Sequence, residues 1–166
     1  MKPRVAIIGV GNMGGAIARI LVKTLGKKNL FLCDRGDDPN KAITPADIVI
    51  LAVKPQSFDD LANSINTKLD GKLIISIMAG ITIKKISKKL GIKNIIRSMP
   101  NLGVQVEAGL IGWIATPGVT AKKRQDAHSL FSALGHSIQV KKESLLNALT
   151  ALSGSGLAYF FYLIPW

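Results

Sequence analysis

The sequence feature that most constrains the fold is a glycine-rich turn that directly follows a short apolar run. Residues 5–8 are continuously apolar, and residues 9–14 then have the pattern Gly-x-Gly-x-x-Gly. Apolar side chains recur at helical spacing over residues 16–21. A strand, a tight glycine turn and a helix, in that order, form the setting in which this motif binds the pyrophosphate of a dinucleotide.

Each glycine of this turn has a distinct physical role. Gly9 permits the tight turn, Gly11 lets the backbone approach a pyrophosphate, and Gly14 lets the helix pack closely on the strand. The start of the following helix offers free N–H groups and a partial positive charge. The sequence therefore predicts a phosphate-binding turn near the N-terminus.

Apolar runs alternate with amphipathic helical patterns along the rest of the chain. Further strands are expected at residues 30–33, 47–53, 73–78, 94–99, 110–115 and 137–140. Helices are expected at residues 57–65, 82–90 and 120–134, and a last helix begins near residue 143. Ser57, with Asp60 three residues later, forms a capping-box-like start for the first of these helices. This alternation predicts an α/β fold with a mostly parallel sheet.

The connector between the second and third expected strands is short. It spans residues 35–46 and contains Gly36, Pro39 and Pro45. A parallel crossover needs a dozen or more residues, usually with a helix, and two prolines leave little room for one. We expect the chain to return to the sheet without a full second βαβ unit.

Composition limits the classes of partner. The chain has 166 residues, of which 48% are hydrophobic, enough for one packed domain. The net charge is +12, but lysines such as Lys84 and Lys88 lie on the outer face of an amphipathic helix. No zinc-finger, RNA-recognition or basic-zipper pattern accompanies them, so we expect no nucleic-acid partner.

The longest apolar stretch and the single cysteine bear on location. Residues 157–166 are too few to cross a bilayer, so we expect no membrane span. Cys33 is the only cysteine, which excludes a disulfide framework and fits a reducing, cytoplasmic setting.

Two adjacent residues at the end of the second expected strand are candidates for binding the ribose of a dinucleotide. Asp34 lies 20 residues after Gly14, where an acidic residue would bind the ribose 2′-hydroxyl of NAD. Arg35 follows it, and an arginine there favours the 2′-phosphate of NADP. The two residues point to opposite cofactors, so NADP(H) and NAD(H) both stay open.

Other candidate ligand contacts follow the later strands, where open α/β sheets bind ligands. They are Val53, Lys54, Pro55, Ala79, Gly80 and Asn101.

The sequence offers no catalytic dyad and no metal-ligand cluster. His128 and His136 are isolated, and Cys33 is better explained as a small core residue. Ser153 and Ser155 lie in Ser-Gly-Ser-Gly rather than in the Gly-x-Ser-x-Gly turn of hydrolases. We therefore predict no catalytic side chain and no metal.

Taken together, these motifs resemble the pyrroline-5-carboxylate reductase family. The matching stretches run in family order along almost the whole chain: VAIIGVGNMGGAIA (5–18), ADIVILAVKPQ (46–56), LIISIMAGITI (73–83), IIRSMPN (95–101), LFSALG (130–135), ALTALSGSG (148–156) and AYFFYLI (158–164). The resemblance implies a Rossmann-like, doubly wound NAD(P)-binding domain over residues 1–142. It implies that residues 143–166 begin a helical dimerisation domain, which is incomplete here.

The resemblance also implies a reaction and a set of contacts. The reaction is hydride transfer from NAD(P)H to the C=N bond of 1-pyrroline-5-carboxylate, a small molecule, giving L-proline in proline biosynthesis. The pyrophosphate would lie on Gly9, Gly11, Asn12, Met13 and Gly14. The adenosine ribose would lie between Asp34 and Arg35, the groove would be lined by Val53, Lys54 and Pro55, and the nicotinamide would lie toward Ala79, Gly80 and Asn101.

The chain departs from the family at several positions. The family continues into an all-helical domain that builds a homo-oligomer and supplies a substrate-binding loop from the partner subunit. This chain stops inside the first of those helices, with Pro165 where a helix should continue. Leu157 replaces a proline, Leu102-Gly103 replaces Thr-Pro, and the short connector matches the loss of a helix and a strand. We expect negligible turnover by the chain alone, and an exposed, adhesive apolar tail.

Two alternatives remain beside the reductase interpretation. One is a stand-alone NAD(P)-binding protein without reductase activity. The other is another Rossmann reductase, such as an F420-dependent NADP reductase or a prephenate-dehydrogenase-like protein. The TALSGSG and Met-Pro-Asn stretches argue against this last class.

Overall fold

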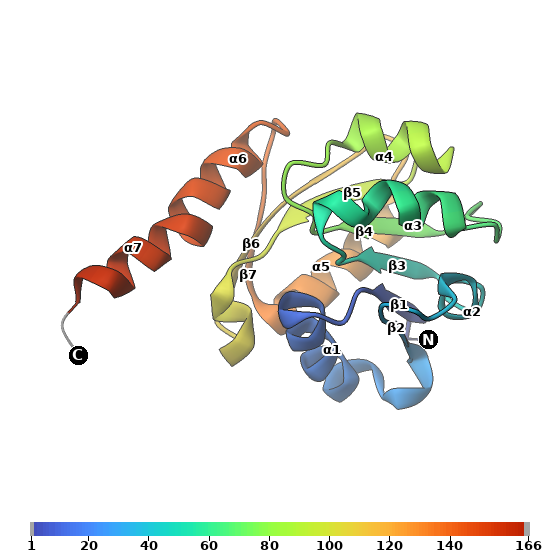
Figure 1. Cartoon of the computed structure of the whole chain (residues 1–166), viewed down its shortest axis with the longest axis horizontal. Helices are drawn as coiled ribbons and strands as arrows, with labels where there is room; N and C mark the ends of the chain where they lie inside the picture. Colours follow the sequence, from blue (N-terminus) through green and yellow to red (C-terminus); the bar gives the residue numbers. More distant parts are fainter. Residues whose placement is uncertain (1, 165–166) are drawn as a thin grey trace.

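A computed structural model describes residues 2–164, and Figure 1 shows its elements. These residues form one seven-stranded sheet in the order β2-β1-β3-β4-β5-β6-β7. The strands are β1 (Val5–Ile8), β2 (Leu30–Cys33), β3 (Ile48–Leu51), β4 (Leu73–Ser76), β5 (Ile95–Met99), β6 (Gly109–Ala115) and β7 (Gly135–Gln139). Neighbouring strands are parallel except β5 and β6, which are antiparallel. The expected α/β fold with a mostly parallel sheet is confirmed.

Helices cover both faces of the sheet (Figure 1). One face packs against α1 (Asn12–Leu25) and α5 (Ala121–Leu134), and the other packs against α2 (Pro39–Ile43), α3 (Phe58–Ser64) and α4 (Ile83–Leu90). Strand side chains alternate between the two cores: Val5 and Ile7 face α1, whereas Ala6 and Ile8 face the opposite side. A strand that is buried on both faces needs a continuous apolar run, which is what β1 has.

The chain reverses its direction across the sheet beside β1. From β1 it moves to β2 at the edge, and then crosses back to β3 on the other side of β1. In open α/β sheets, such a switch point leaves a crevice at the carboxyl ends of the strands. The glycine turn at residues 9–14 lies at this crevice.

The short connector holds no strand within the described residues, which confirms the shortened second unit. It does hold the five-residue helix α2, so the two prolines leave more room for a helix than expected. Pro39 occupies the first turn, where its missing N–H costs nothing. The Asp38 carboxylate caps this helix by accepting from the Asn40 N–H at 2.9 Å.

The expected side-chain cap at Ser57 is wrong, whereas the last helix begins close to where it is expected. Ser57 makes no side-chain cap, because a 3-10 turn at Pro55–Ser57 leads directly into α3. The last helical segment begins at residue 145 and runs through α6 (Leu145–Leu149), a π-helical turn (Thr150–Ser155) and α7 (Gly156–Leu163). Pro165, expected to interrupt it, lies outside the described residues.

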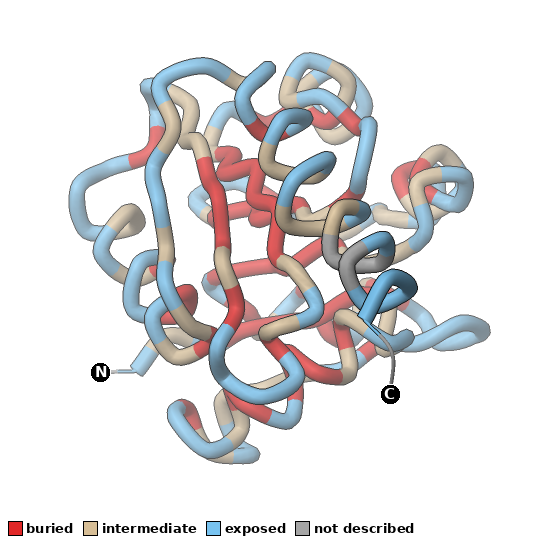
Figure 2. The backbone as a smooth tube through the Cα atoms, turned by 90° about the vertical axis from the view of Figure 1, so that its left-hand side faces the viewer, coloured by how far each residue is buried: buried red, intermediate tan, exposed pale blue. Residues whose placement is uncertain are grey.

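This C-terminal helical segment projects away from the sheet (Figure 1) and is mostly exposed or half-buried (Figure 2). Leu146 is its buried contact with the body of the domain. No helix within residues 2–164 is long and apolar enough to span a lipid bilayer.

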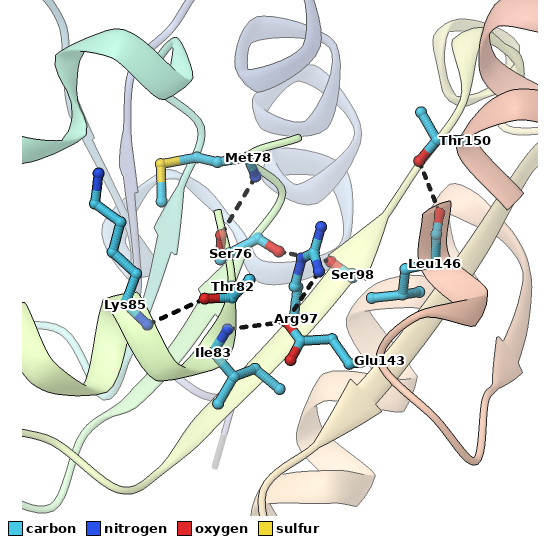
Figure 3. A network of polar contacts seen from close by, with 10 residues as sticks. All are labelled: Ser76, Met78, Thr82, Ile83, Lys85, Arg97, Ser98, Glu143, Leu146 and Thr150. Atoms are coloured by element: carbon cyan, nitrogen blue, oxygen red, sulfur yellow. Dashed lines mark hydrogen bonds and ion pairs between the residues drawn. The ribbon is translucent and has the colours of Figure 1, made fainter. Parts of the chain in front are cut away.

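An ion pair between a buried arginine and a half-buried glutamate fixes the start of this segment (Figure 3). Arg97, on β5, is 2% exposed, and its Nη1 donates to Glu143 Oε1 at 2.9 Å. The same carboxylate oxygen accepts from the Ile83 N–H, at the start of α4, at 2.9 Å. One carboxylate therefore joins β5, α4 and the beginning of the C-terminal helices.

Replacing Glu143 by alanine should destabilise the domain. The change leaves the buried Arg97 guanidinium without its carboxylate, which costs about 3 kcal/mol of unfolding free energy. Urea denaturation measures this loss. In a matched control, Lys122→Gln removes an exposed ion pair with Asp126, and should change stability by less than about 0.5 kcal/mol. Equal, small losses for both variants would contradict the assignment.

Candidate functional site

The glycine turn connects three strands at the switch point. Gly9 has φ +94°, and its N–H donates to the Cys33 carbonyl at 2.8 Å, which ties β1 to the end of β2. A Cβ on Gly9 would lie 2.8 Å from the carbonyl carbon of Ala52, just after β3. The positive φ and the close approach both require glycine.

Helix α1 starts immediately above this turn. Gly14 is buried in its first turn, and a Cβ there would overlap the Gly9 carbonyl oxygen. Gly11 is the N-cap residue and provides no side-chain cap, so the first N–H groups of α1 are available for an external acceptor. A Cβ on Gly11 would meet nothing within 4 Å, which shows open space above the turn.

The other two residues of the motif differ in exposure. Asn12 is exposed at the helix start, whereas Met13 is half-buried and packs partly against the core that α1 shares with the sheet. The open side of the turn is thus made by backbone groups and Asn12. Backbone N–H groups at a helix N-terminus can bind an anion such as a phosphate.

The remaining predicted residues lie along the same edge of the sheet. Val53, Lys54 and Pro55 follow β3, Ala79 and Gly80 follow β4, and Asn101 follows β5. Lys54, Ala79 and Gly80 are exposed. From β2 to β5 the strand order is β2-β1-β3-β4-β5, so this edge forms an extended track that starts at Asp34 and passes over the glycine turn.

Asn101 has a structural contact within this track. Its Oδ1 accepts from the Leu110 N–H at 2.9 Å, which holds the connection between β5 and β6. The side-chain oxygen is therefore already used by the fold.

Asp34 lies beside the glycine turn. Its Oδ1 is 3.4 Å from the Val10 N–H, and its own N–H donates to Asp37 Oδ2 at 2.9 Å. Arg35 is exposed. The structure thus brings Asp34 into contact with the turn, and its contact with a ribose stays a prediction.

Burial and nearby charges shift the pKa values of Cys33 and Asp38, which lie near the end of β2. Burial raises the pKa of the Cys33 thiol, and the negative charges of Asp37, Asp34 and Asp38 raise it further. The hydrogen bond from the Asn40 N–H lowers the pKa of Asp38. Cys33 is therefore a neutral core thiol with three carboxylates around it.

Two buried serines, Ser76 on β4 and Ser98 on β5, are not predicted by the sequence. Ser76 Oγ accepts from the Met78 N–H at 3.3 Å, and Ser98 Oγ donates to the Ser76 carbonyl at 3.4 Å (Figure 3). Both are fully buried. The signal for Ser76 is a polar residue at the end of an otherwise apolar strand, whereas Ser98 follows Arg97 inside β5. They hold the loop that leaves β4.

The residues set aside on sequence grounds lie away from this edge or serve the fold. His128 and His136 are exposed, and Ser153 Oγ donates to the Leu149 carbonyl within its own helix. Among residues 2–164, no group of three or more His, Cys, Asp or Glu side chains is arranged to hold a metal ion.

The known proteins to which this chain is similar in sequence share one name. Residues 35–80 match the family model described as NADP oxidoreductase coenzyme F420-dependent. The chain is 34% identical to the pyrroline-5-carboxylate reductase of Aquifex aeolicus, over 97% of the chain and 66% of that protein. It is 36% identical to the enzyme of the same name from Synechocystis sp., over 99% of the chain and 68% of that protein. The chain spans about two thirds of the length of these relatives.

Solved structures show the same similarity. The Plasmodium falciparum pyrroline carboxylate reductase with NADP bound matches with a TM-score of 0.88 at 27% identity, over 98% of this chain and 66% of that one. The Coxiella burnetii pyrroline-5-carboxylate reductase matches with a TM-score of 0.84 at 29% identity, over 98% and 68% of the two chains.

Two glycine substitutions should separate packing from open space at the turn. Gly14→Ala places a methyl group against the Gly9 carbonyl and should lower the unfolding free energy by about 2 kcal/mol or more. Gly11→Ala, with open space and φ −70°, should change it by less than about 0.5 kcal/mol. Thermal and urea unfolding test both. A Gly14→Ala protein with the same unfolding free energy as the unchanged chain would contradict the close contact.

Proposed function

This chain belongs to the pyrroline-5-carboxylate reductase family, and from that premise we propose that it binds a nicotinamide dinucleotide on the carboxyl edge of its sheet. The observation that carries the proposal is the glycine turn. It places the uncapped start of α1 at the switch point between β1 and β3, with open space above Gly11. This arrangement fits a pyrophosphate, since the backbone can approach the phosphates and the helix start stabilises their charge.

The order of the predicted residues along the sheet supports an extended cofactor. Residues 9–14 would hold the pyrophosphate, and Asp34 and Arg35, on the β2 side, would flank the adenosine ribose. Residues 53–55 would line the groove on the other side, and residues 79–80 and Asn101 would lie toward the nicotinamide. The buried Ser76 and Ser98 hold the start of the loop after β4 through the Met78 N–H and the Ser76 carbonyl.

The proposed reaction is reduction of 1-pyrroline-5-carboxylate to L-proline. When bound, the cofactor would supply a hydride to the carbon of the C=N bond, while the nitrogen takes up a proton. A cyclic imine is electrophilic once protonated, so the main task of the protein is to position the two reactants. This agrees with a site that is built from backbone and small side chains.

We also propose a division of the chain. Residues 1–142 form the cofactor-binding domain, and residues 143–166 begin a helical domain that carries the substrate site and the subunit contacts. Glu143 is the first residue of that second part and holds it to β5 through Arg97. The buried, neutral Cys33 fits our proposal of a cytoplasmic protein.

Calorimetric titration of the purified chain with NADH and with NADPH tests the cofactor assignment. At least one should bind, and Gly11→Ala should weaken that binding about tenfold or more, because its methyl group occupies the path of the pyrophosphate. Gly71→Asn is the matched control. It lies at the opposite edge of the sheet with φ +74°, a conformation that asparagine tolerates, and should bind as the unchanged chain does.

An assay of proline formation tests the reaction. About a third of the Aquifex aeolicus relative lies beyond the matched region, and we place the substrate-binding loop there. The 166 residues alone should bind the cofactor yet form proline far more slowly than that relative, assayed in parallel. Turnover at a comparable rate would contradict this placement of the substrate site. Failure to bind either cofactor would contradict the proposed function itself.

The exposed face of α7 should make the chain self-associate. Tyr159, Tyr162 and Leu163 are spaced to share one face of the helix, and they are 72%, 88% and 76% exposed. We expect light scattering to show a mass that rises with concentration. Tyr162→Glu combined with Leu163→Glu should abolish the rise, because it places charge in the contact. A monomer at all concentrations before substitution would contradict this contact.

A further inference from the structure

We infer that Glu143 is a positioning residue for the nicotinamide half of the cofactor, because its carboxylate joins the start of the C-terminal helices to the loop along which that half would lie. The loop runs from the end of β4 to the start of α4, over residues 77–82. Glu143 would act through this loop rather than by touching the cofactor. This inference rests on the proposed function and adds a residue that acts on one end of the proposed site.

The loop presents two exposed residues between two buried ones. Ala79 and Gly80 are exposed, whereas Met78 before them and Ile81 after them are 1% and 8% exposed and belong to the core shared with α2, α3 and α4. An exposed pair between buried neighbours is placed by the contacts that hold each end. The position of residues 79–80 therefore depends on what holds the loop at β4 and at α4.

The sheet itself holds the β4 end of the loop. Ser76 Oγ accepts from the Met78 N–H at 3.3 Å, and Ser98 Oγ donates to the Ser76 carbonyl at 3.4 Å. Both serines are fully buried and belong to strands, β4 and β5. The contacts at this end therefore do not involve the C-terminal helices.

Glu143 holds the α4 end, from 60 residues further along the chain (Figure 3). Its Oε1 accepts at 2.9 Å from the Ile83 N–H, one of the first N–H groups of α4, which have no acceptor within the helix. Thr82, the N-cap residue, accepts from the Lys85 N–H at 3.2 Å through its hydroxyl group. The first turn of α4 is thus held both by its own cap and by a carboxylate, which the helix dipole favours there.

Arg97 fixes the position of this carboxylate. Arg97 is 2% exposed and is paired with Ser76 in the register of β4 and β5, and its Nη1 donates to Glu143 Oε1 at 2.9 Å. Its Nε has no hydrogen-bond partner within residues 2–164, so the guanidinium depends on Glu143 to compensate its buried charge. The two ends of the loop are therefore tied to neighbouring residues of the sheet, to Ser76 directly and to Arg97 through Glu143.

The backbone of Glu143 belongs to the C-terminal segment. Its carbonyl accepts from the Leu146 N–H at 3.1 Å, and Leu146 is the buried residue of α6. A shift of these helices would move the carboxylate and, with it, the hydrogen bond to Ile83. None of these contacts involves residues 9–14, which would hold the pyrophosphate. Loss of the carboxylate should therefore affect the nicotinamide half of the cofactor and spare the other half.

Calorimetric titration with a pair of ligands tests the inference. One ligand is the dinucleotide that the unchanged chain binds, NADH or NADPH. The other is the fragment of it that lacks nicotinamide, ADP-ribose or 2′-phospho-ADP-ribose. The variants are Glu143→Ala, Glu143→Gln and Glu143→Asp, with Lys122→Gln, which removes an exposed ion pair, as the control. Glutamine keeps an acceptor oxygen for the Ile83 N–H, whereas aspartate keeps the charge on a side chain that is one methylene shorter.

The unchanged chain should bind the dinucleotide at least about tenfold more tightly than the fragment. Glu143→Ala should reduce this ratio to about twofold or less, while the Kd of the fragment changes by less than about twofold. Glu143→Asp should also reduce the ratio, because the shorter side chain cannot reach both Ile83 and Arg97. Glu143→Gln should keep the ratio within about twofold of its original value, and Lys122→Gln should leave it unchanged.

A role for Glu143 in stability alone gives a different result. It would weaken the binding of both ligands equally in Glu143→Ala, and that outcome would overturn the inference. An unchanged ratio in Glu143→Ala and Glu143→Asp, with their folds verified by thermal unfolding, would also overturn it. If Glu143→Ala does not fold, the ratio in Glu143→Asp decides. A ratio in Glu143→Gln as low as that in Glu143→Ala would overturn the role of the hydrogen bond to Ile83.

Failure of the inference and failure of the proposed function are distinguishable. A fragment that binds the unchanged chain as tightly as the dinucleotide does would overturn the inference and leave the proposed cofactor binding in place. Binding of neither ligand by the unchanged chain, with its fold verified by thermal unfolding, would overturn the proposed function and this inference with it.

Discussion

The close contact between Gly9 and Gly14 is the constraint on which the candidate site depends. It brings the first turn of α1 against the end of β1, while Gly9 also lies against the Ala52 carbonyl after β3. A side chain at either glycine would push the helix away from the switch point. The contact therefore leaves the uncapped N–H groups of α1 beside the crevice. The other candidate contacts follow along the sheet edge on either side of this point.

A second constraint acts at the far end of the track. The buried Arg97 is paired with Glu143, and this carboxylate also accepts from the first N–H of α4 (Figure 3). The pair costs desolvation free energy, so its value is in fixing a geometry rather than in raw stability. It aligns the loop after β4 with the start of the C-terminal helices, where we place the second domain.

The sequence predicts the strands, the glycine turn and the shortened second unit well, because apolar runs and glycine patterns are local. It does not reveal the role of Glu143, since its partner Arg97 lies 46 residues away. Likewise, the antiparallel pairing of β5 with β6 depends on tertiary packing. The sequence does not predict helix α2, because two prolines leave little room for a helix in so short a connector, although proline is well tolerated at a helix start.

The most direct test of the central claim is hydrogen exchange of the backbone amides with and without saturating nicotinamide dinucleotide. The account predicts that amide exchange slows most in residues 9–15, where the turn and the start of α1 would hold the pyrophosphate. The exchange rates of amides in α5, which packs on a face of the sheet, should change little. A chain that binds the cofactor while residues 9–15 exchange at an unchanged rate would contradict the claim that this turn is the binding site.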